Sequence, residues 1–132
     1  MHALLVGADR ASWTAFSAEL TAAGFQIEWA DTCEKALDAA GARTFDLMVT
    51  DEQIGKTNGL ECIKALVTRN PLLNCAAVSS LSAHDFHEAR EGLGVLMQLP
   101  PGPGRADARK LIDHLDAILN LGKKAGKKES AS

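Results

Sequence analysis

Short apolar segments alternate with amphipathic stretches along most of the chain. Five of the apolar segments have the length and composition of strands buried in a sheet. These segments cover residues 4–6, 25–30, 45–50, 75–78 and 95–99. Between them, apolar residues recur at helical spacing, as Trp13, Phe16 and Leu20 do after the first segment. The pattern therefore predicts five strands, each followed by a helix.

Residues that begin and end helices lie where this pattern requires them. Gly24 and Gly41 follow the first two helical stretches, as residues that end a helix do. Asp31 or Thr32 is expected to cap the second helix, and Ser82 with Asp85 resembles a capping box for the fourth. The last helix is predicted at about residues 105–121, after a segment rich in proline and glycine.

Regular alternation of strands and helices requires right-handed crossovers, which build a parallel sheet with helices on both faces. We therefore expect an α/β fold: a doubly wound, five-stranded parallel sheet of the flavodoxin-like order 2-1-3-4-5 with five helices. Residues 1–121 are predicted to form this domain. Residues 122–132, a lysine-rich tail with no apolar period, are predicted to be disordered.

Composition and charge narrow the function classes. Hydrophobic residues make up 46% of the 132 residues, and no apolar run approaches the length of a membrane span. The tail holds four lysines, so the rest of the chain is more acidic than the net charge of −3, which argues against nucleic-acid binding. No signal peptide is visible at the start, and we expect a cytoplasmic protein without membrane contact.

Three cysteines, Cys33, Cys62 and Cys75, occur without CxxC spacing. An odd number at irregular spacing is typical of reduced residues in a cytosolic protein. We therefore predict neither a disulfide nor a zinc site.

Asp51 follows the third predicted strand, at the sheet edge where open α/β folds place ligand chemistry. The segment from Asp51 to Asn58-Gly59-Leu60 resembles the phosphoacceptor segment of response-regulator receiver domains, Asp-x-x-x-Pro-x-x-Asp/Asn-Gly-Leu. Gly55 stands where that pattern has proline. The order of the predicted elements is also similar to that of receivers, over residues 3–120.

The resemblance implies a role in two-component phosphorelay signalling, with Asp51 taking a phosphoryl group from a histidine kinase. It also implies that Ser79, or else Ser80, is the switch hydroxyl after the fourth strand. Such transfer needs Mg²⁺ held by hard oxygen ligands. It also needs positively charged groups that neutralise the negative charge on the phosphoryl oxygens. Asp9 and Asp51 are the candidate ligands for that metal.

The chain departs from the family pattern at the groups that support the chemistry. Gly7 and Ala8 occupy the places of the acid pair, and Asp9 falls one place later. Leu99 or Pro100 occupies the place of the lysine. Losing one preorganised group costs a factor of about 10² to 10³ in rate. The sequence therefore indicates an atypical receiver with weak or no phosphorylation.

We expect this receiver to act without enzymatic activity and without a bound cofactor. Since no output domain follows residue 121, it is expected to work as a stand-alone module. It would bind a protein partner, a histidine kinase or an output protein, as receivers do through the fourth helix, fifth strand and fifth helix. We also expect a cis peptide bond at Leu99–Pro100 or Pro100–Pro101, because receivers tend to have one there.

Two alternatives remain open from the sequence. The first is a conventional Mg²⁺-dependent receiver that uses Asp9 and Asp51, which requires the first strand to be shifted by one residue. The second is a small flavodoxin-like enzyme or nucleotide binder, although neither GxGxxG nor GxxxxGK[ST] is present. Arg10 and Lys56 are candidate pocket cations: each either reaches the Asp51 pocket or points to solvent.

Overall fold

The computed structural model describes the backbone of residues 1–131 and the side chains of residues 1–118. Its main sheet has five parallel strands in the order β2-β1-β3-β6-β7. These are β1 (His2–Val6), β2 (Gln26–Ala30), β3 (Leu47–Thr50), β6 (Asn74–Val78) and β7 (Val95–Leu99). The order is the predicted 2-1-3-4-5, so the doubly wound α/β fold is confirmed.

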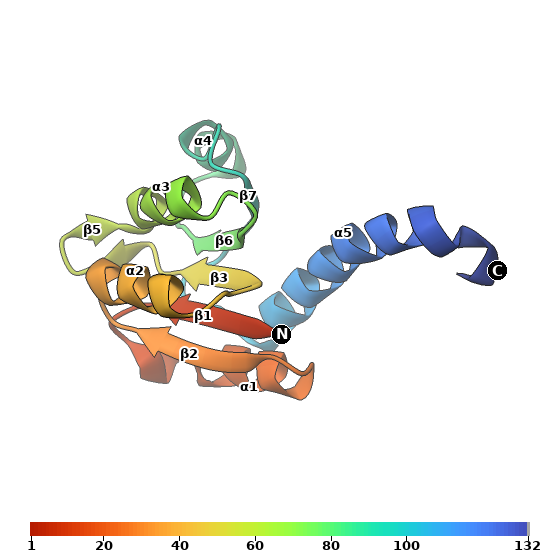
Figure 1. The fold of residues 1–132 in the computed structure, drawn as a ribbon. Coiled ribbons are helices and arrows are strands. Elements are labelled where there is room, and N and C mark those ends of the chain that lie inside the picture. Colours follow the sequence, from red (N-terminus) through yellow and green to blue (C-terminus); the bar gives the residue numbers. More distant parts are fainter. Residues whose placement is uncertain (132) are drawn as a thin grey trace.

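Helices cover both faces of this sheet (Figure 1). They are η1 (Arg10–Trp13), α1 (Thr14–Ala22), α2 (Cys33–Ala42), α3 (Gly59–Arg69), α4 (Ala83–Ala89) and α5 (Arg105–Ala131). One apolar core lies between the sheet and α1 with α5, and includes Trp13, Phe16 and Leu111. The second core lies on the opposite face, where Ile63 of α3 and Phe86 of α4 are buried. The five predicted α-helices are thus all present.

Side chains cap two helices as the sequence predicted. Thr32, one of the two candidates, accepts a hydrogen bond from the backbone N–H of Lys35 at 3.1 Å and so caps α2. Ser82 accepts one from the N–H of Asp85, also at 3.1 Å, at the start of α4.

A small hairpin follows β3 that the sequence pattern did not predict. Its strands are β4 (Gln53–Ile54) and β5 (Thr57–Asn58), which pair antiparallel. Gly55, with a φ of 62°, and Lys56 form the turn between them. Strands of two residues are too short to give a period in the sequence, which explains the omission.

Helix α5 is longer than expected. It continues to Ala131, through residues for which the sequence predicted a disordered tail, and Ser132 lies outside the described residues. Figure 1 shows its last turns extending away from the sheet. Alanine and lysine are strong helix formers, and extending a packed helix needs no new nucleation. Among the described helices, none is both long and apolar enough to cross a bilayer.

The prediction of reduced cysteines was wrong for two of the three. Cys33 of α2 and Cys62 of α3 form a disulfide with a Cα–Cα distance of 5.7 Å. The two helices pack against the same face of the sheet, a proximity that sequence spacing cannot reveal. Cys75 is free and buried, and burial raises the pKa of its thiol to about 12.

The prediction of a cis peptide bond was also wrong. Leu99–Pro100 and Pro100–Pro101 are both trans, as are the other peptide bonds of the described chain. The trans form is the favoured one even before proline, by about 0.5–1 kcal/mol.

Candidate functional site

Asp51 lies at the carboxyl end of β3, in the middle of the sheet edge, as the sequence predicted. Its backbone N–H donates to the carbonyl of Val6 at 2.8 Å, which continues the pairing of β3 with β1. The side chain is half-buried, and its Oδ1 accepts a hydrogen bond from the N–H of Glu52 at 2.8 Å. The backbone therefore holds this carboxylate in a defined position at the sheet edge.

The Asn58-Gly59 turn returns to Asp51. Asn58 Oδ1 accepts from the N–H of Leu60 at 2.8 Å and so caps α3. Gly59 packs so closely that a Cβ there would overlap the backbone oxygen of Asp51 and lie 2.9 Å from Thr50 Oγ1. Glycine at this position thus allows α3 to start directly against the end of β3.

Gly7 is the residue of the first loop that lies beside Asp51. Val6 pairs with Thr50, so the residue after each strand comes next to the other. A Cβ at Gly7 would lie 3.3 Å from Asp51 Cβ and 3.5 Å from its Oδ2. Neither Gly7 nor the exposed Ala8 has a side-chain oxygen, so this side of Asp51 lacks a second carboxylate.

Asp9 lies beyond these two residues and is exposed. It precedes η1, but its side chain makes no capping hydrogen bond; its backbone carbonyl accepts from the N–H and the hydroxyl of Ser12. The structure thus places Asp9 at the start of the short helix, with its carboxylate unpaired among the described contacts.

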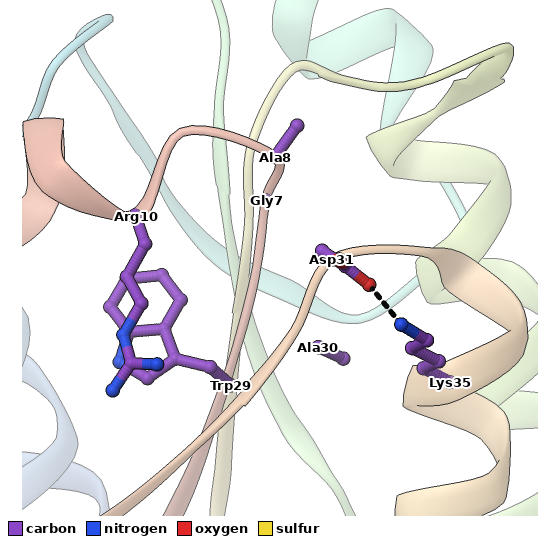
Figure 2. Close-up of a pocket in the computed structure, with 7 residues that line it drawn as sticks. All are labelled: Gly7, Ala8, Arg10, Trp29, Ala30, Asp31 and Lys35. Atoms are coloured by element: carbon purple, nitrogen blue, oxygen red, sulfur yellow. Dashed lines mark ion pairs between the residues drawn. The ribbon is translucent and has the colours of Figure 1, made fainter.

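Arg10 lies against Trp29 of β2, with its guanidinium carbon 5.3 Å from the ring centroid. Figure 2 shows this pair on one side of a pocket of about 280 Å³ and the ion pair of Asp31 with Lys35 on the other. The two charged atoms of that ion pair are 2.9 Å apart, and the hydrogen bond from Lys35 lowers the pKa of Asp31. Asp31, which supplies the one carboxylate in the pocket lining, is therefore already paired with the ammonium group of Lys35.

Lys56, the other candidate cation, lies in the exposed turn of the β4–β5 hairpin. Within the part of the chain that the structure describes, neither Lys56 nor Arg10 forms an ion pair.

Glu52, which the sequence interpretation passed over, connects Asp51 to both candidate switch hydroxyls. Its Oε2 accepts from Ser80 N–H at 3.0 Å, from Ser80 Oγ at 2.9 Å and, at 3.5 Å, from the buried Ser79 Oγ. These serines follow β6, so the contact joins the ends of two neighbouring strands. The only signal in the sequence was the position of Glu52 next to Asp51.

Gln98 of β7 holds the same loop from the other side. Its side-chain amide donates to the backbone carbonyls of Ser79 at 3.0 Å and Leu81 at 2.7 Å. The next residue, Leu99, is fully buried in the core formed with α1 and α5, whereas Pro100 is exposed. The end of β7 thus presents a neutral amide to this loop and an apolar side chain to the core.

The structure is similar to several solved receiver structures. It matches the chemotaxis response regulator CheY4 of Vibrio cholerae with a TM-score of 0.76 and 18% identity, over 86% of this chain and 97% of the other. A CheY-like receiver domain protein from Methanospirillum hungatei matches with the same TM-score and identity, over 94% and 97% of the two chains.

A response regulator from Burkholderia pseudomallei, solved with a phosphorylated aspartic acid, a calcium ion and citrate, matches with a TM-score of 0.73 and 17% identity. That match covers 96% of this chain and 74% of the other. At these identities the likeness establishes the fold alone.

No curated protein matches this chain in sequence. The family model described as the response regulator receiver domain matches residues 3–98, which include all five strands of the main sheet except the first residue of β1 and the last of β7. The matched segment also contains the loop after each of the first four of these strands, and with it Asp51. The chain therefore belongs to the response regulator receiver domain family.

Proposed function

We propose that this receiver domain acts as a protein-interaction module in two-component signalling, with weak or no phosphoryl transfer to Asp51. The observation that carries the proposal is Gly7 beside Asp51, where a Cβ would lie 3.5 Å from the carboxylate oxygen. A residue with a side-chain carboxylate in this place would supply a second hard ligand, and glycine supplies none.

The residues at this edge do not fit a Mg²⁺ site of the kind that the resemblance to receivers implies. Mg²⁺ needs near-octahedral oxygen coordination and is usually held by one or two carboxylates. Asp51 is half-buried beside Gly7, and the carboxylate of Glu52 accepts three hydrogen bonds from serines. Stabilisation of the negative charge on a transferring phosphoryl group would therefore rest on neutral hydrogen-bond donors. Each charged group that is lost lowers the rate of transfer by a factor of about 10² to 10³.

The conventional receiver that uses Asp9 with Asp51 is less well supported. It requires β1 to be shifted by one residue, so that Asp9 comes closer to the acceptor. The pairing of Val6 with Thr50 instead brings Gly7 next to Asp51 and leaves Asp9 exposed at η1.

The face that we propose for partner binding comprises α4, β7 and α5. Leu81, in the loop before α4, is 42% exposed, and Leu96 and Met97 of β7 are only partly buried. Exposed and partly exposed apolar side chains near a charged helix suit a protein partner, here a histidine kinase or an output protein. No catalytic step is assigned to the domain itself.

An amide NMR titration with Mg²⁺ and then beryllofluoride, which mimics the aspartyl phosphate, tests the proposal. We expect no shifts centred on Asp51 at millimolar Mg²⁺ and none on adding beryllofluoride, in the wild type or in Asp51→Asn. Shifts that begin at Asp51, reach Ser79 and α4, and disappear in Asp51→Asn would show a working phosphorylation switch and refute the proposal.

A further inference from the structure

Glu52 connects the end of β3 to the loop that leads into α4. Its carboxylate oxygen Oε2 accepts from the backbone N–H and the hydroxyl of Ser80 and, at a longer distance, from the hydroxyl of Ser79. The partners are separated from Glu52 by 27 and 28 residues in sequence. The two contacts of Ser80 are exposed and that of Ser79 is partly buried, but all three have a carboxylate as acceptor, and hydrogen bonds to a charged group are stronger than those between neutral groups.

The same loop is held at two further points. The hydroxyl of Ser79 accepts from the N–H of Leu81 at 3.1 Å, and Gln98 donates to the carbonyls of Ser79 and Leu81. Glu52 therefore contacts the loop from β3 and Gln98 contacts it from β7. Ser82, the next residue, caps α4, so the position of this loop sets where α4 begins.

Glu52 is also coupled to the candidate phosphoacceptor. Its backbone N–H donates to Asp51 Oδ1 at 2.8 Å, while its side chain occupies the donors of the serine loop. A phosphoryl group on Asp51 would add negative charge next to Glu52 and would need hydrogen-bond donors itself. Glu52 and such a group would therefore compete for Ser79 and Ser80.

We propose that Glu52 is a positioning residue that holds the loop between β6 and α4, and with it the start of α4, in one conformation. The side-chain carboxylate acts as an internal ligand of Ser79 and Ser80 in place of an external anion. The link to Asp51 rests on the proposed function. The holding of the loop does not, because it follows from contacts present without any phosphoryl group.

Amide hydrogen exchange and chemical shifts, measured without Mg²⁺ or a phosphoryl donor, test this role. We expect the Ser80 amide to exchange about ten- to a hundredfold faster in Glu52→Ala, since a hydrogen bond to a charged acceptor is lost. Glu52→Gln keeps an oxygen acceptor without the charge and should give an intermediate rate. In both variants the shift changes should extend from Ser80 into α4.

Glu61→Gln is the matched control, because Glu61 is an exposed acid of the nearby α3. It should leave the Ser80 amide unchanged. Glu52→Gln carries the test if Glu52→Ala does not fold. An unchanged Ser80 exchange rate in a folded Glu52 variant, with shifts confined to residues 51–53, would overturn the proposal. This outcome is independent of the beryllofluoride titration, so the two proposals fail separately.

Discussion

Gly7 and Asp51 lie side by side at the carboxyl ends of β1 and β3, so close that a Cβ on Gly7 would be 3.3 Å from Asp51 Cβ. This relationship follows from the register of the two strands, in which Val6 is the partner of Thr50. A side chain at position 7 would therefore share the environment of the Asp51 carboxylate. Glycine allows this close approach and leaves Asp51 without an acidic neighbour on this side.

Restoring acids at positions 7 and 8 should create a metal site. In the double variant Gly7→Asp/Ala8→Asp we expect Mg²⁺ binding at millimolar concentration, because the new carboxylate at position 7 stands beside Asp51 and the one at position 8 follows it in the same loop. Isothermal titration calorimetry would measure the affinity. Adding Asp51→Asn to the double variant should abolish the binding; if it does not, the introduced acids bind the metal without Asp51 and the proposed geometry is wrong.

The Cys33–Cys62 disulfide predicts a specific pattern of thiol labelling. An alkylating reagent at neutral pH should label no cysteine in the native, unreduced protein, because Cys75 is buried and its thiol has a pKa of about 12. Mild reduction should allow labelling of Cys33, which is partly exposed, whereas Cys62 is as buried as Cys75. Denaturation with reduction should expose all three. Mass spectrometry locates the labels, and a label on Cys33 before reduction would contradict the disulfide.

The same disulfide should stabilise the fold. It closes a loop between residues 29 apart, and a bridge of this size contributes about 3 kcal/mol to the free energy of unfolding. We expect chemical denaturation of the wild type to require less denaturant once a reductant is present. Cys33→Ser should be insensitive to reductant and about as stable as the reduced wild type, which separates loss of the bridge from other effects of the reagent.

Local pattern was sufficient to predict the main sheet, the helices and the position of Asp51. The capping roles of Thr32 and Ser82 were also predictable, because a cap acts within three residues. Contacts between residues far apart in the sequence were not predictable from local pattern. The disulfide and the bond from Glu52 to Ser80 each join residues 28 or 29 apart, and neither leaves a periodic signal.

The role of Arg10 illustrates the same limit. Its sequence position next to Asp9 favoured a cation for the Asp51 pocket or a side chain in solvent. In the structure Arg10 is exposed, in line with the second alternative, and its guanidinium also lies over the ring of Trp29, whose strand pairs with β1. Only the register of β1 with β2 brings these two side chains together, and single-sequence patterns do not give register between strands.

Gly59 and Gly41 form a matched pair for testing the close packing at the Asp51 turn. A Cβ at Gly59 would overlap the Asp51 backbone, so Gly59→Ala should lower the free energy of unfolding by about 1–3 kcal/mol. Gly41 of α2 has open space around it, and Gly41→Ala should be neutral or stabilising by up to about 1 kcal/mol. Urea denaturation compares the two; equal effects would mean that the turn can move away from α3.

Positions 99 and 100, the two candidates for the lysine of receivers, should respond in opposite ways to a lysine. Leu99 is fully buried in the core with Trp13 and Leu111, so Leu99→Lys loses apolar packing and buries a charge. We expect it to lower the free energy of unfolding by about 3–5 kcal/mol. Pro100 is exposed, and Pro100→Lys should change stability by less than about 1 kcal/mol. If Leu99→Lys proves as stable as the wild type in denaturant titrations, then a side chain at 99 can leave the core for the sheet edge. In that case Asp51 would lack a nearby ammonium group only because residue 99 is a leucine, and not because the packing of the core prevents a side chain at position 99 from reaching the sheet edge.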